Sequence, residues 1–297
     1  MNKRGKLKIF LISLLVLLLI FAVFAAVVYF SGYEIFREIR YGENDANVID
    51  IYIPKEAYER ENNGCVLFIH GGSWSSGDKN DEDARCRLLA SHGYISASLN
   101  YTLWSEDSAD SYSVLQVLDE IDEALLKIKE FSSEREIDVG KIAITGYSAG
   151  AHLAMLYSYS RAESAPIDIA FTASMAGPAD ISPQVWGEDM SIRVIKRLTG
   201  EEISADSLRT GEADEIIASV SPTTFINELS PPTLLMHGGK DTVVPIANAD
   251  TLVNRLSEHA VYHEYVYLPD SDHSLIHNPI GHLKYFVKLF EYCKKYF

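Results

Sequence analysis

Hydrophobic and polar residues follow three successive patterns along this chain of 297 residues. Residues 9–30 form an uncharged, strongly apolar run of 22 residues behind a basic start. Residues 31–45 are mostly polar and indicate a linker. From residue 46 to residue 297, short apolar runs alternate with stretches whose apolar residues recur at helical spacing. The pattern therefore predicts one large α/β domain behind an apolar N-terminal segment.

The domain pattern predicts seven strands and four helices, in addition to a further helix that Pro245 begins. The strands are expected at residues 48–53, 64–69, 94–99, 141–145, 169–174, 232–236 and 262–267, and the helices at residues 80–92, 112–131, 149–160 and 278–296. Residues 48–53 alternate apolar and polar positions, which favours an edge strand, whereas residues 64–69 are continuously apolar, as in a buried parallel strand. The alternation predicts a mostly parallel, doubly wound sheet. Residues 181–230 interrupt the rhythm and indicate a cap-like insertion.

The N-terminal apolar run is long enough to cross a bilayer. As a helix, 22 residues would span roughly 33 Å at ~1.5 Å per residue. The basic residues of segment 1–8 precede the run, which favours a cytoplasmic N-terminus and an external domain. We expect a single-pass signal anchor at residues 9–30, with the membrane as a partner. The alternative is a signal peptide cleaved near Val23-Phe24-Ala25, which would release a secreted protein.

Charge and cysteine usage exclude several classes of function. Four of the 26 basic residues precede the apolar run, so the remainder carries 22 basic against 42 acidic residues, a formal charge of −20. Such a surface repels nucleic acid, and we expect no nucleic-acid partner. Cys65, Cys86 and Cys293 are an odd set without a CxxC motif, which predicts neither a disulfide framework nor a zinc site. We expect no metal and no cofactor.

The sequence GYSAG occupies residues 146–150, between a predicted buried strand and a predicted helix. This strand-turn-helix setting is typical of a G-x-S-x-G nucleophile elbow. The two glycines remove side chains from the sharp turn, and Ser148 is the candidate nucleophile. The helix that starts behind it adds backbone N–H donors and the positive end of its dipole.

A serine hydroxyl needs a base to take its proton, and the last predicted strand is followed by the segment LPDSDHSL with His273. His263 falls within a strand pattern, and His277 and His282 fall near or on the last helix. His273 is therefore the candidate base.

The base needs a carboxylate to orient it, and Asp241 follows another buried strand in LLMHGGKDTVVP. Capping the helix that Pro245 begins is a compatible role for Asp241. Asp180 in GPADI is the rival acid, while Asp270 and Asp272 are too close to the base in sequence to orient its ring easily. The order Ser148, Asp241, His273 is the order of α/β-hydrolase triads.

The segment HGGSW at residues 70–74 is a candidate oxyanion hole. Adjacent glycines let the main chain approach a reacting oxygen without interference from Cβ atoms. The expected donors are the N–H groups of Gly71, Gly72, Ser73 and Ala149. A tight turn would produce the same glycines.

Four side chains around these two motifs also receive roles. Trp74 and Tyr147 flank the motifs and are expected to contact substrate. His70 is expected to hydrogen-bond within its loop. His152, four residues after Ser148, is expected to be a buried packing histidine.

Together, these motifs resemble the serine carboxylesterases of the α/β-hydrolase fold. They are HGGSWSSGDK, NYTL, GYSAGAHLA, SPTTFI and PPTLLMHGGKDTVVP, spread over residues 46–297. The branch they resemble most is that of bacterial acetyl and feruloyl esterases, near hormone-sensitive lipases and kynurenine formamidases. The resemblance implies a triad of Ser148, Asp241 and His273 and an oxyanion hole at the HGG loop.

Three positions depart from the family pattern. Tyr147 stands at a common histidine, Ser73 at a third glycine and Ala151 at another common glycine. None of these changes removes a catalytic atom. The N-terminal apolar segment is unusual for the branch and weakens a formamidase interpretation, since the usual substrate of formamidases is intracellular.

The resemblance and the N-terminal segment together imply a membrane-anchored extracellular serine esterase. Its expected substrates are small acyl esters, with acetylated glycans as one candidate. Two alternatives remain open, a catalytically idle hydrolase fold that binds at the cell surface and a serine peptidase of the prolyl type.

Overall fold

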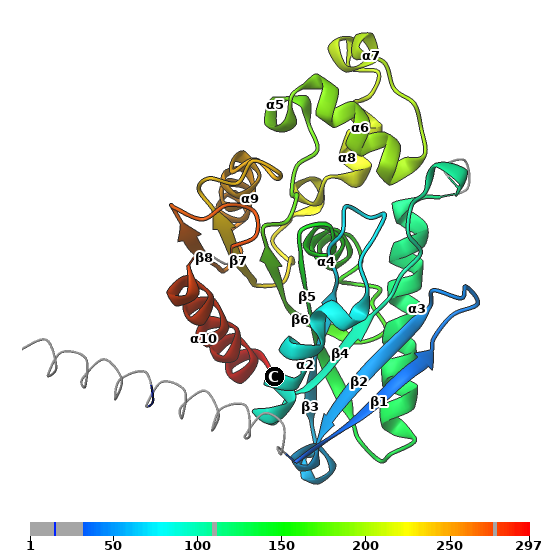
Figure 1. Ribbon diagram of the computed structural model, residues 1–297, viewed down its shortest axis with the longest axis vertical. Coiled ribbons are helices and arrows are strands. Elements are labelled where there is room, and N and C mark those ends of the chain that lie inside the picture. The colour runs from blue at the N-terminus through cyan, green and yellow to red at the C-terminus, as the bar shows by residue number, and fades with distance from the viewer. Residues whose placement is uncertain (1–14, 16–31, 109–111, 276–277) are drawn as a thin grey trace, which may run out of the picture.

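The computed structural model describes residues 15, 32–108, 112–275 and 278–297. An eight-stranded sheet forms its centre, with strand order β1-β2-β4-β3-β5-β6-β7-β8 (Figure 1). Strands β3 to β8 pair in parallel, while β2 runs antiparallel to both β1 and β4. The strands are β1 Tyr33–Arg40, β2 Val48–Pro54, β3 Asn63–Ile69, β4 Ile95–Leu99, β5 Val139–Tyr147, β6 Asp168–Met175, β7 Thr233–Gly238 and β8 His263–Leu268. The predicted α/β-hydrolase-like fold with a mostly parallel sheet is confirmed.

Helices cover both faces of the sheet because successive strand residues point to opposite sides. In β3, Leu67 packs with α3 Val114–Ser133 and α4 Ala149–Ser160, while Phe68 packs with α2 Asp83–Ser91 and α10 Pro279–Tyr296. Helix α9 Ala247–Glu258 packs beside α4 on the first face. Short 3₁₀ turns lie at η1 Lys55–Glu59, η2 Lys79–Glu82, η3 Glu106–Ser108 and η4 Pro222–Phe225. Because helices cover both faces of the sheet, side chains on both sides of each central strand are buried, and these strands are almost wholly apolar.

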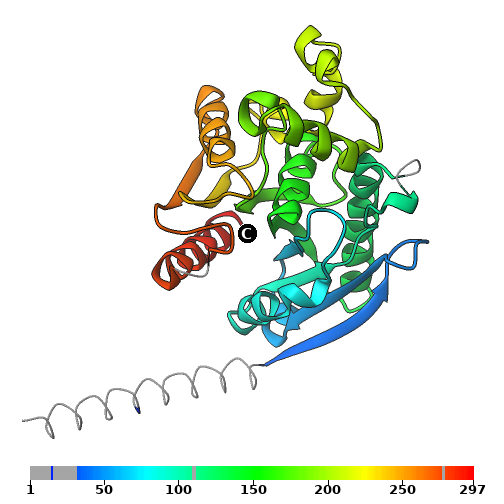
Figure 2. The same ribbon diagram turned by 45° about the horizontal axis from the view of Figure 1, so that its top comes forward.

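Residues 181–230 lie at one end of the molecule, as both Figure 1 and Figure 2 show. The segment folds mainly as four short helices. They are α5 Pro183–Trp186, α6 Glu188–Thr199, α7 Ala205–Thr210 and α8 Asp214–Val220. Helix α6 turns Val194, Ile195 and Leu198 into the core that α3 and α4 share. The insertion is therefore packed onto the domain through the apolar stripe of α6.

The linker predicted at residues 31–45 is wrong over its first half, because Tyr33–Arg40 forms the edge strand β1. Its apolar residues alternate with charged ones, but a register shift between Phe36 and Ile39 breaks the period of two. Glu38 takes a left-handed φ of 54° within this bulge. The expected edge position of residues 48–53 is corrected by the same finding, since β1 covers β2.

Among the described residues, no helix combines the length and the apolar character needed to cross a membrane. The segment predicted as an anchor, residues 9–30, lies outside the described residues except for Leu15.

A buried ion network joins strand β1 to the segment that follows the HGGSW loop. The Lys79 side chain is 2% exposed, and its ammonium lies 3.1 Å from Asp50 Oδ1 and pairs with Glu38. The other oxygen of Asp50 accepts a hydrogen bond of 2.7 Å from Arg37 Nη1. Asp50 is fully buried, so its charge depends on these cations. The network thus links β1, β2 and η2.

We predict that Asp50→Ala lowers the free energy of unfolding by about 3–5 kcal/mol, because Lys79 loses a partner in a buried site. Urea denaturation followed by circular dichroism measures this change. Asp270→Ala is the matched control, since Asp270 pairs with Lys240 at 2.8 Å on an exposed surface. That variant should change stability by less than about 1 kcal/mol. Equal effects for the two variants would contradict a structural role for the network.

Candidate active site

Three loops at the carboxyl ends of β5, β7 and β8 bring the predicted catalytic residues together. Ser148 follows β5, Asp241 follows β7 and His273 follows β8. His273 Nε2 lies 2.9 Å from Ser148 Oγ, and His273 Nδ1 lies 2.7 Å from Asp241 Oδ2. With Nδ1–H donating to the carboxylate, Nε2 is free to accept the serine proton. This arrangement can deprotonate Ser148 as its oxygen attacks an electrophile.

The backbone at Ser148 is strained and firmly held. Its φ of 54° and ψ of −120° are rare for a residue with a side chain. The N–H of Ser148 donates to Met175 O on the neighbouring strand at 2.8 Å. A Cβ on Gly150 would lie 2.0 Å from Ile69 O, so only glycine lets the start of α4 pack against the end of β3. The elbow therefore projects Ser148 from a rigid corner.

Asp241 is oriented by its own turn. Its Oδ1 accepts the N–H groups of Val243 and Val244, both at 2.9 Å, which leaves Oδ2 for His273. His237 Nε2 donates to Val244 O at 3.0 Å and lies 3.4 Å from Asp241 Oδ2. Burial lowers the pKa of His237, so the neutral ring does not compete for the carboxylate charge. Asp241 therefore orders its own turn and orients His273, but it does not cap α9 as predicted, because that helix begins at Ala247 and its N-cap Ile246 makes no side-chain hydrogen bond.

The rival carboxylates are engaged elsewhere. Asp180 accepts the N–H of Ser182 at 2.8 Å. Asp272 accepts the N–H and the hydroxyl of Ser274, and Asp270 pairs with Lys240 at the surface. The structure therefore brings Asp241, and not Asp180, to the histidine.

The HGGSW loop lies directly against the elbow. A Cβ on Gly71 would lie 2.9 Å from Tyr147 O and 3.4 Å from the Ser148 Cβ, so the glycine permits the close approach predicted for this loop. Gly72, Ser73 and Trp74 all have positive φ, at 114°, 53° and 59°. The N–H groups of Ser75 and Ser76 donate to Gly72 O, which closes the turn. A glycine would adopt this left-handed backbone freely. At Ser73 the surrounding structure has to maintain it.

Of the four predicted oxyanion donors, Gly71 lies against the elbow and Ala149 directly follows Ser148. Gly71, Gly72 and Ser73 belong to the loop, and Ala149 is the first residue of α4. The first N–H groups of a helix have no intrahelical acceptor, so that of Ala149 can donate to a ligand. Backbone donors beside a nucleophile can stabilise a negatively charged oxygen.

The Tyr147 and Trp74 side chains make different contacts around the site. Tyr147 is half-buried, and its hydroxyl donates to His273 O at 2.8 Å, which ties the histidine loop to the elbow. Trp74 is only 4% exposed, and its indole N–H donates to His152 Nδ1 at 3.2 Å. The substrate contact predicted for the Trp74 side chain is therefore corrected, because the indole packs beneath the loop.

The expectation of a buried His152 is confirmed, but this side chain also connects three segments. His152 Nε2 donates to Val220 O, the last residue of α8, at 2.8 Å, while Nδ1 accepts from Trp74. Burial lowers the pKa of His152 to about 4, so the ring stays neutral at pH 7. The chain Trp74–His152–Val220 joins the loop, α4 and the insertion. No local sequence signal pairs Trp74 with a residue 78 positions away.

The His70 ring also remains within its own loop, as expected. Its Nδ1 lies 2.7 Å from Gly71 O, and the ring stacks on Tyr101. Burial lowers the pKa of His70, so it too is neutral at pH 7.

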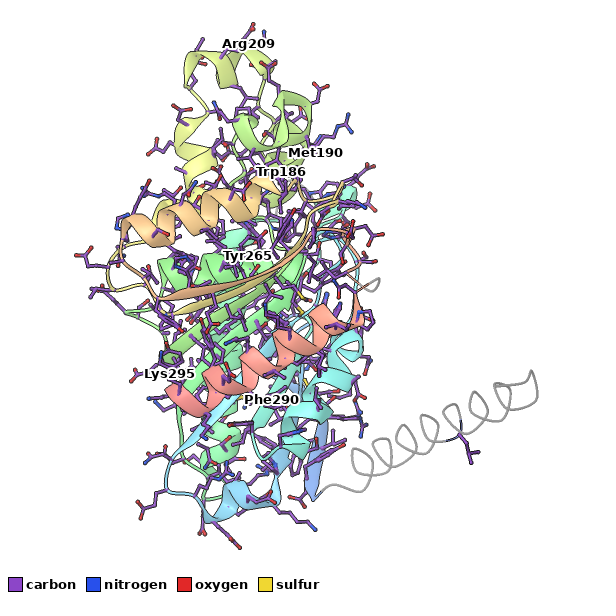
Figure 3. The ribbon with its side chains drawn as sticks, turned by 90° about the vertical axis from the view of Figure 1, so that its left-hand side faces the viewer. Trp186, Met190, Arg209, Tyr265, Phe290 and Lys295 are labelled. Atoms are coloured by element: carbon purple, nitrogen blue, oxygen red, sulfur yellow. The ribbon has the colours of Figure 1, made fainter. Side chains whose placement is uncertain are left out.

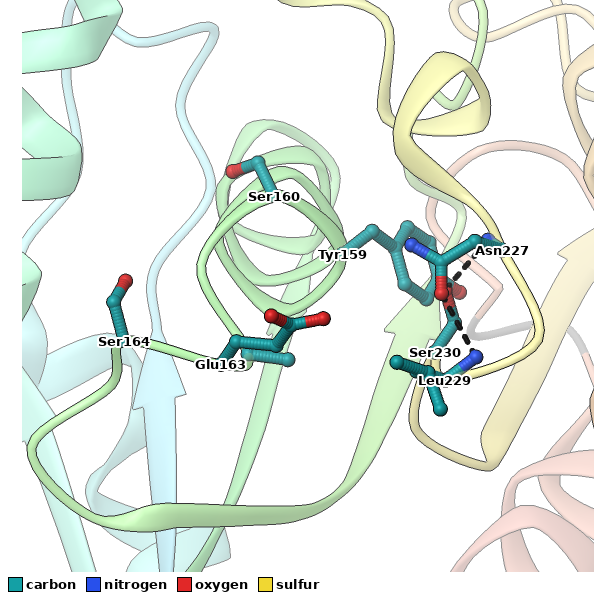
Figure 4. A pocket seen from close by; sticks show the side chains of 8 residues that line it. Tyr159, Ser160, Glu163, Ser164, Asn227, Leu229 and Ser230 are labelled. Atoms are coloured by element: carbon teal, nitrogen blue, oxygen red, sulfur yellow. Dashed lines mark hydrogen bonds between the residues drawn. The ribbon is translucent and has the colours of Figure 1, made fainter.

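A cavity of about 280 Å³ lies at the far end of α4 (Figure 4). Tyr159, Glu163 and Asn227 are among its lining residues. At ~1.5 Å per residue along the helix, Tyr159 is roughly 16 Å from Ser148, so this cavity is separate from the candidate site. Within the described ranges, His, Cys, Asp and Glu side chains form no group of three or more that could hold a metal ion.

Comparisons with known proteins show which sequences and folds this chain resembles. The BD-FAE family model matches residues 49–256. Two relatives from Mycobacterium tuberculosis are "Esterase LipC", 26% identical over 74% of this chain, and "Probable carboxylic ester hydrolase LipM", 28% identical over 74% of it. The alignments cover 54% and 51% of those proteins, so the chain spans about half the length of the curated relatives it matches.

A solved structure titled "Truncated form of carbohydrate esterase from gut microbiota" has a TM-score of 0.73 to the chain at 18% identity. The match covers 90% of this chain and 97% of that protein. At this identity the likeness establishes the fold.

We predict that the free energy of unfolding falls as the pH drops from about 6.5 to about 4. The folded chain keeps His152 neutral in this window, whereas the unfolded chain binds a proton there. The contribution of His152 is about 3 kcal/mol. His70 and His237, with lowered pKa values, act in the same direction. Urea titrations of wild type and His152→Gln at several pH values should give a smaller pH dependence for the variant. A variant with the wild-type slope would contradict the prediction.

Proposed function

The chain belongs to the BD-FAE family, and on that premise we propose that it is a serine carboxylic-ester hydrolase with Ser148, His273 and Asp241 as its catalytic triad. The observation that carries the proposal is the continuous hydrogen-bond chain from Asp241 through His273 to Ser148. Relatives named as esterases support the same reaction class. An idle hydrolase fold would be expected to have lost a member of this set, and all three side chains are present.

The proposed reaction has two halves. Ser148 Oγ attacks the ester carbon while His273 Nε2 takes its proton, and Asp241 stabilises the resulting imidazolium. The negatively charged oxygen accepts hydrogen bonds from the loop N–H groups and from that of Ala149. The C–O bond to the alcohol then breaks, and His273 returns the proton to the departing alcohol. Water, activated by His273, hydrolyses the acyl-enzyme through the same steps.

The proposed substrates are esters of small acyl groups, with acetylated glycans as one class. The solved structure of similar fold is titled a carbohydrate esterase, which supports a carbohydrate alcohol by analogy of fold. A membrane-anchored enzyme with an external domain would also meet such polymers outside the cell. The basic segment at residues 1–8 and the apolar segment at residues 9–30 support that placement.

We predict that Ser148→Ala abolishes saturable hydrolysis of p-nitrophenyl acetate, and that Asp241→Asn lowers kcat by about 10⁴-fold because the histidine loses its orienting partner. The rate of nitrophenolate release by the full-length protein measures the activity of both variants. The same assay with the butyrate and octanoate esters shows how long an acyl chain the site accepts. Asp180→Asn is the matched control and should keep wild-type kcat. Unchanged turnover in Ser148→Ala would refute the assigned nucleophile. Cleavage of a proline-containing peptide, without cleavage of these esters, would favour the peptidase alternative.

We predict that the full-length protein sediments with membranes and resists extraction by carbonate, because residues 9–30 supply an apolar span. Protease added outside intact cells should then digest the domain. Deletion of residues 1–31 should leave the protein in the soluble fraction. A mature protein whose N-terminal sequence begins close after Ala25 would instead establish the cleaved signal peptide.

A further inference from the structure

A second cavity, of about 440 Å³, lies between α6 and the loop that follows β4. Its lining consists of Trp104, Glu106, Arg193, Lys196 and Arg197. The N–H of Trp104 donates to Trp74 O at 2.8 Å, and Trp74 directly follows Ser73 of the HGGSW loop. The cavity is thus joined through the backbone to the proposed oxyanion hole. Its volume falls in the usual range for small-molecule sites.

The cations of this cavity are unusual in such an acidic protein. The chain carries a formal charge of −16, yet three of the five lining residues are basic. In the described part of the chain, neither Arg193 nor Arg197 has a carboxylate within 4.0 Å. Every other described arginine except Arg60 has one. The single lining carboxylate, Glu106, is exposed and leaves an excess of positive charge.

The spacing of these cations is unfavourable for the stability of α6, which indicates that they serve a function. Arg193 and Arg197 are four residues apart on α6, where like charges destabilise a helix by about 0.2–0.5 kcal/mol. The dipole of α6 favours Lys196 and Arg197 in its last turn, but it does not require an aromatic neighbour. The guanidinium of Arg197 lies 5.1 Å from the centre of the Trp104 ring. Lys196 is engaged with Glu202 at 2.6 Å, so the two arginines carry the available charge.

We propose that this cavity is a subsite for an anionic group, a carboxylate or a phosphate, on the alcohol part of the ester substrate. The inference rests on the proposed esterase function. Because the acyl group is proposed to be small, the larger alcohol part is what extends beyond the reaction centre. Two guanidinium groups can form charge-assisted hydrogen bonds to the anion, and the Trp104 ring provides a flat apolar wall for the atoms that carry it. The subsite selects substrates by charge.

Three acetate esters of para-substituted phenols test the proposal. They carry a carbamoylmethyl, a carboxymethyl or a phosphonomethyl group, so the acyl group is constant and the neutral amide matches the carboxylate in shape. The full-length protein is compared with the double variant Arg193→Gln/Arg197→Gln. Arg209→Gln is the matched control, because Arg209 belongs to the same insertion but lies at its tip, outside the cavity (Figure 3).

We expect wild type to hydrolyse the carboxylate or phosphonate ester with a kcat/KM about tenfold above that of the amide, through a lower KM. The preference should weaken as NaCl is raised. The double variant should lose it while its kcat/KM for the amide stays at the wild-type value, and Arg209→Gln should behave as wild type. If only one of the two anionic esters is preferred, that result identifies whether the subsite recognises a carboxylate or a phosphate.

Two results would overturn the subsite, namely equal hydrolysis of all three esters by wild type or an undiminished preference in the double variant. Circular dichroism checks that the double variant is folded, and the single variant Arg193→Gln serves if it is not. If no ester is hydrolysed at all, the proposed function fails separately. Calorimetric titration with glucuronate and with inorganic phosphate then decides. Binding to wild type that the double variant lacks supports the subsite, and no binding to wild type refutes it.

Discussion

Parallel strand pairing from β5 to β8 is the constraint on which the candidate site depends. The register aligns Tyr147 with Met175, and Met175 with Met236, so the strands end at the same edge of the sheet. The bond from Ser148 N to Met175 O extends that register by one residue into the elbow. Loops after β7 and β8 then need only a few residues to bring Asp241 and His273 to the serine. A shift of one strand would separate the three side chains, since each hydrogen bond between them tolerates only a few tenths of an ångström.

The HGGSW loop is supported from both ends. At its start, the close contact of Gly71 with the elbow leaves no room for a side chain. Beyond its end, Lys79 is buried in the ion network of Asp50 and Glu38. Strand β1 therefore helps to hold the segment that follows the loop, because Glu38 supplies a carboxylate to that network. The left-handed backbone of Ser73 and Trp74 is maintained between these two fixed points.

The insertion is connected to the site by polar contacts in addition to apolar packing. The His152 ring bonds to Trp74 on one side and to the last residue of α8 on the other. It can do so because a neutral imidazole is a donor at one nitrogen and an acceptor at the other. Trp104 joins the backbone of Trp74 on one side and the guanidinium of Arg197 on the other. Arg197, one of the two arginines proposed to select substrates by charge, thus contacts a residue that is bonded to the loop proposed to stabilise the oxyanion. Selectivity and catalysis would share one structural support.

The sequence by itself determined the class of fold, the GYSAG elbow, the HGGSW loop and the order of Ser148, Asp241 and His273, because each of these appears as a local pattern. The sequence favoured Asp241 and left Asp180 as its rival, and the tertiary structure brought only Asp241 to His273. Both residues follow buried strands, so strand order and loop direction distinguish them. It also revealed β1, whose bulge breaks the period of two between Phe36 and Ile39. The partnership of Trp74 with His152 and the cavity beside Arg193 and Arg197 join residues far apart in the chain. Such pairs depend on the path of the folded backbone, and no local periodicity records that path.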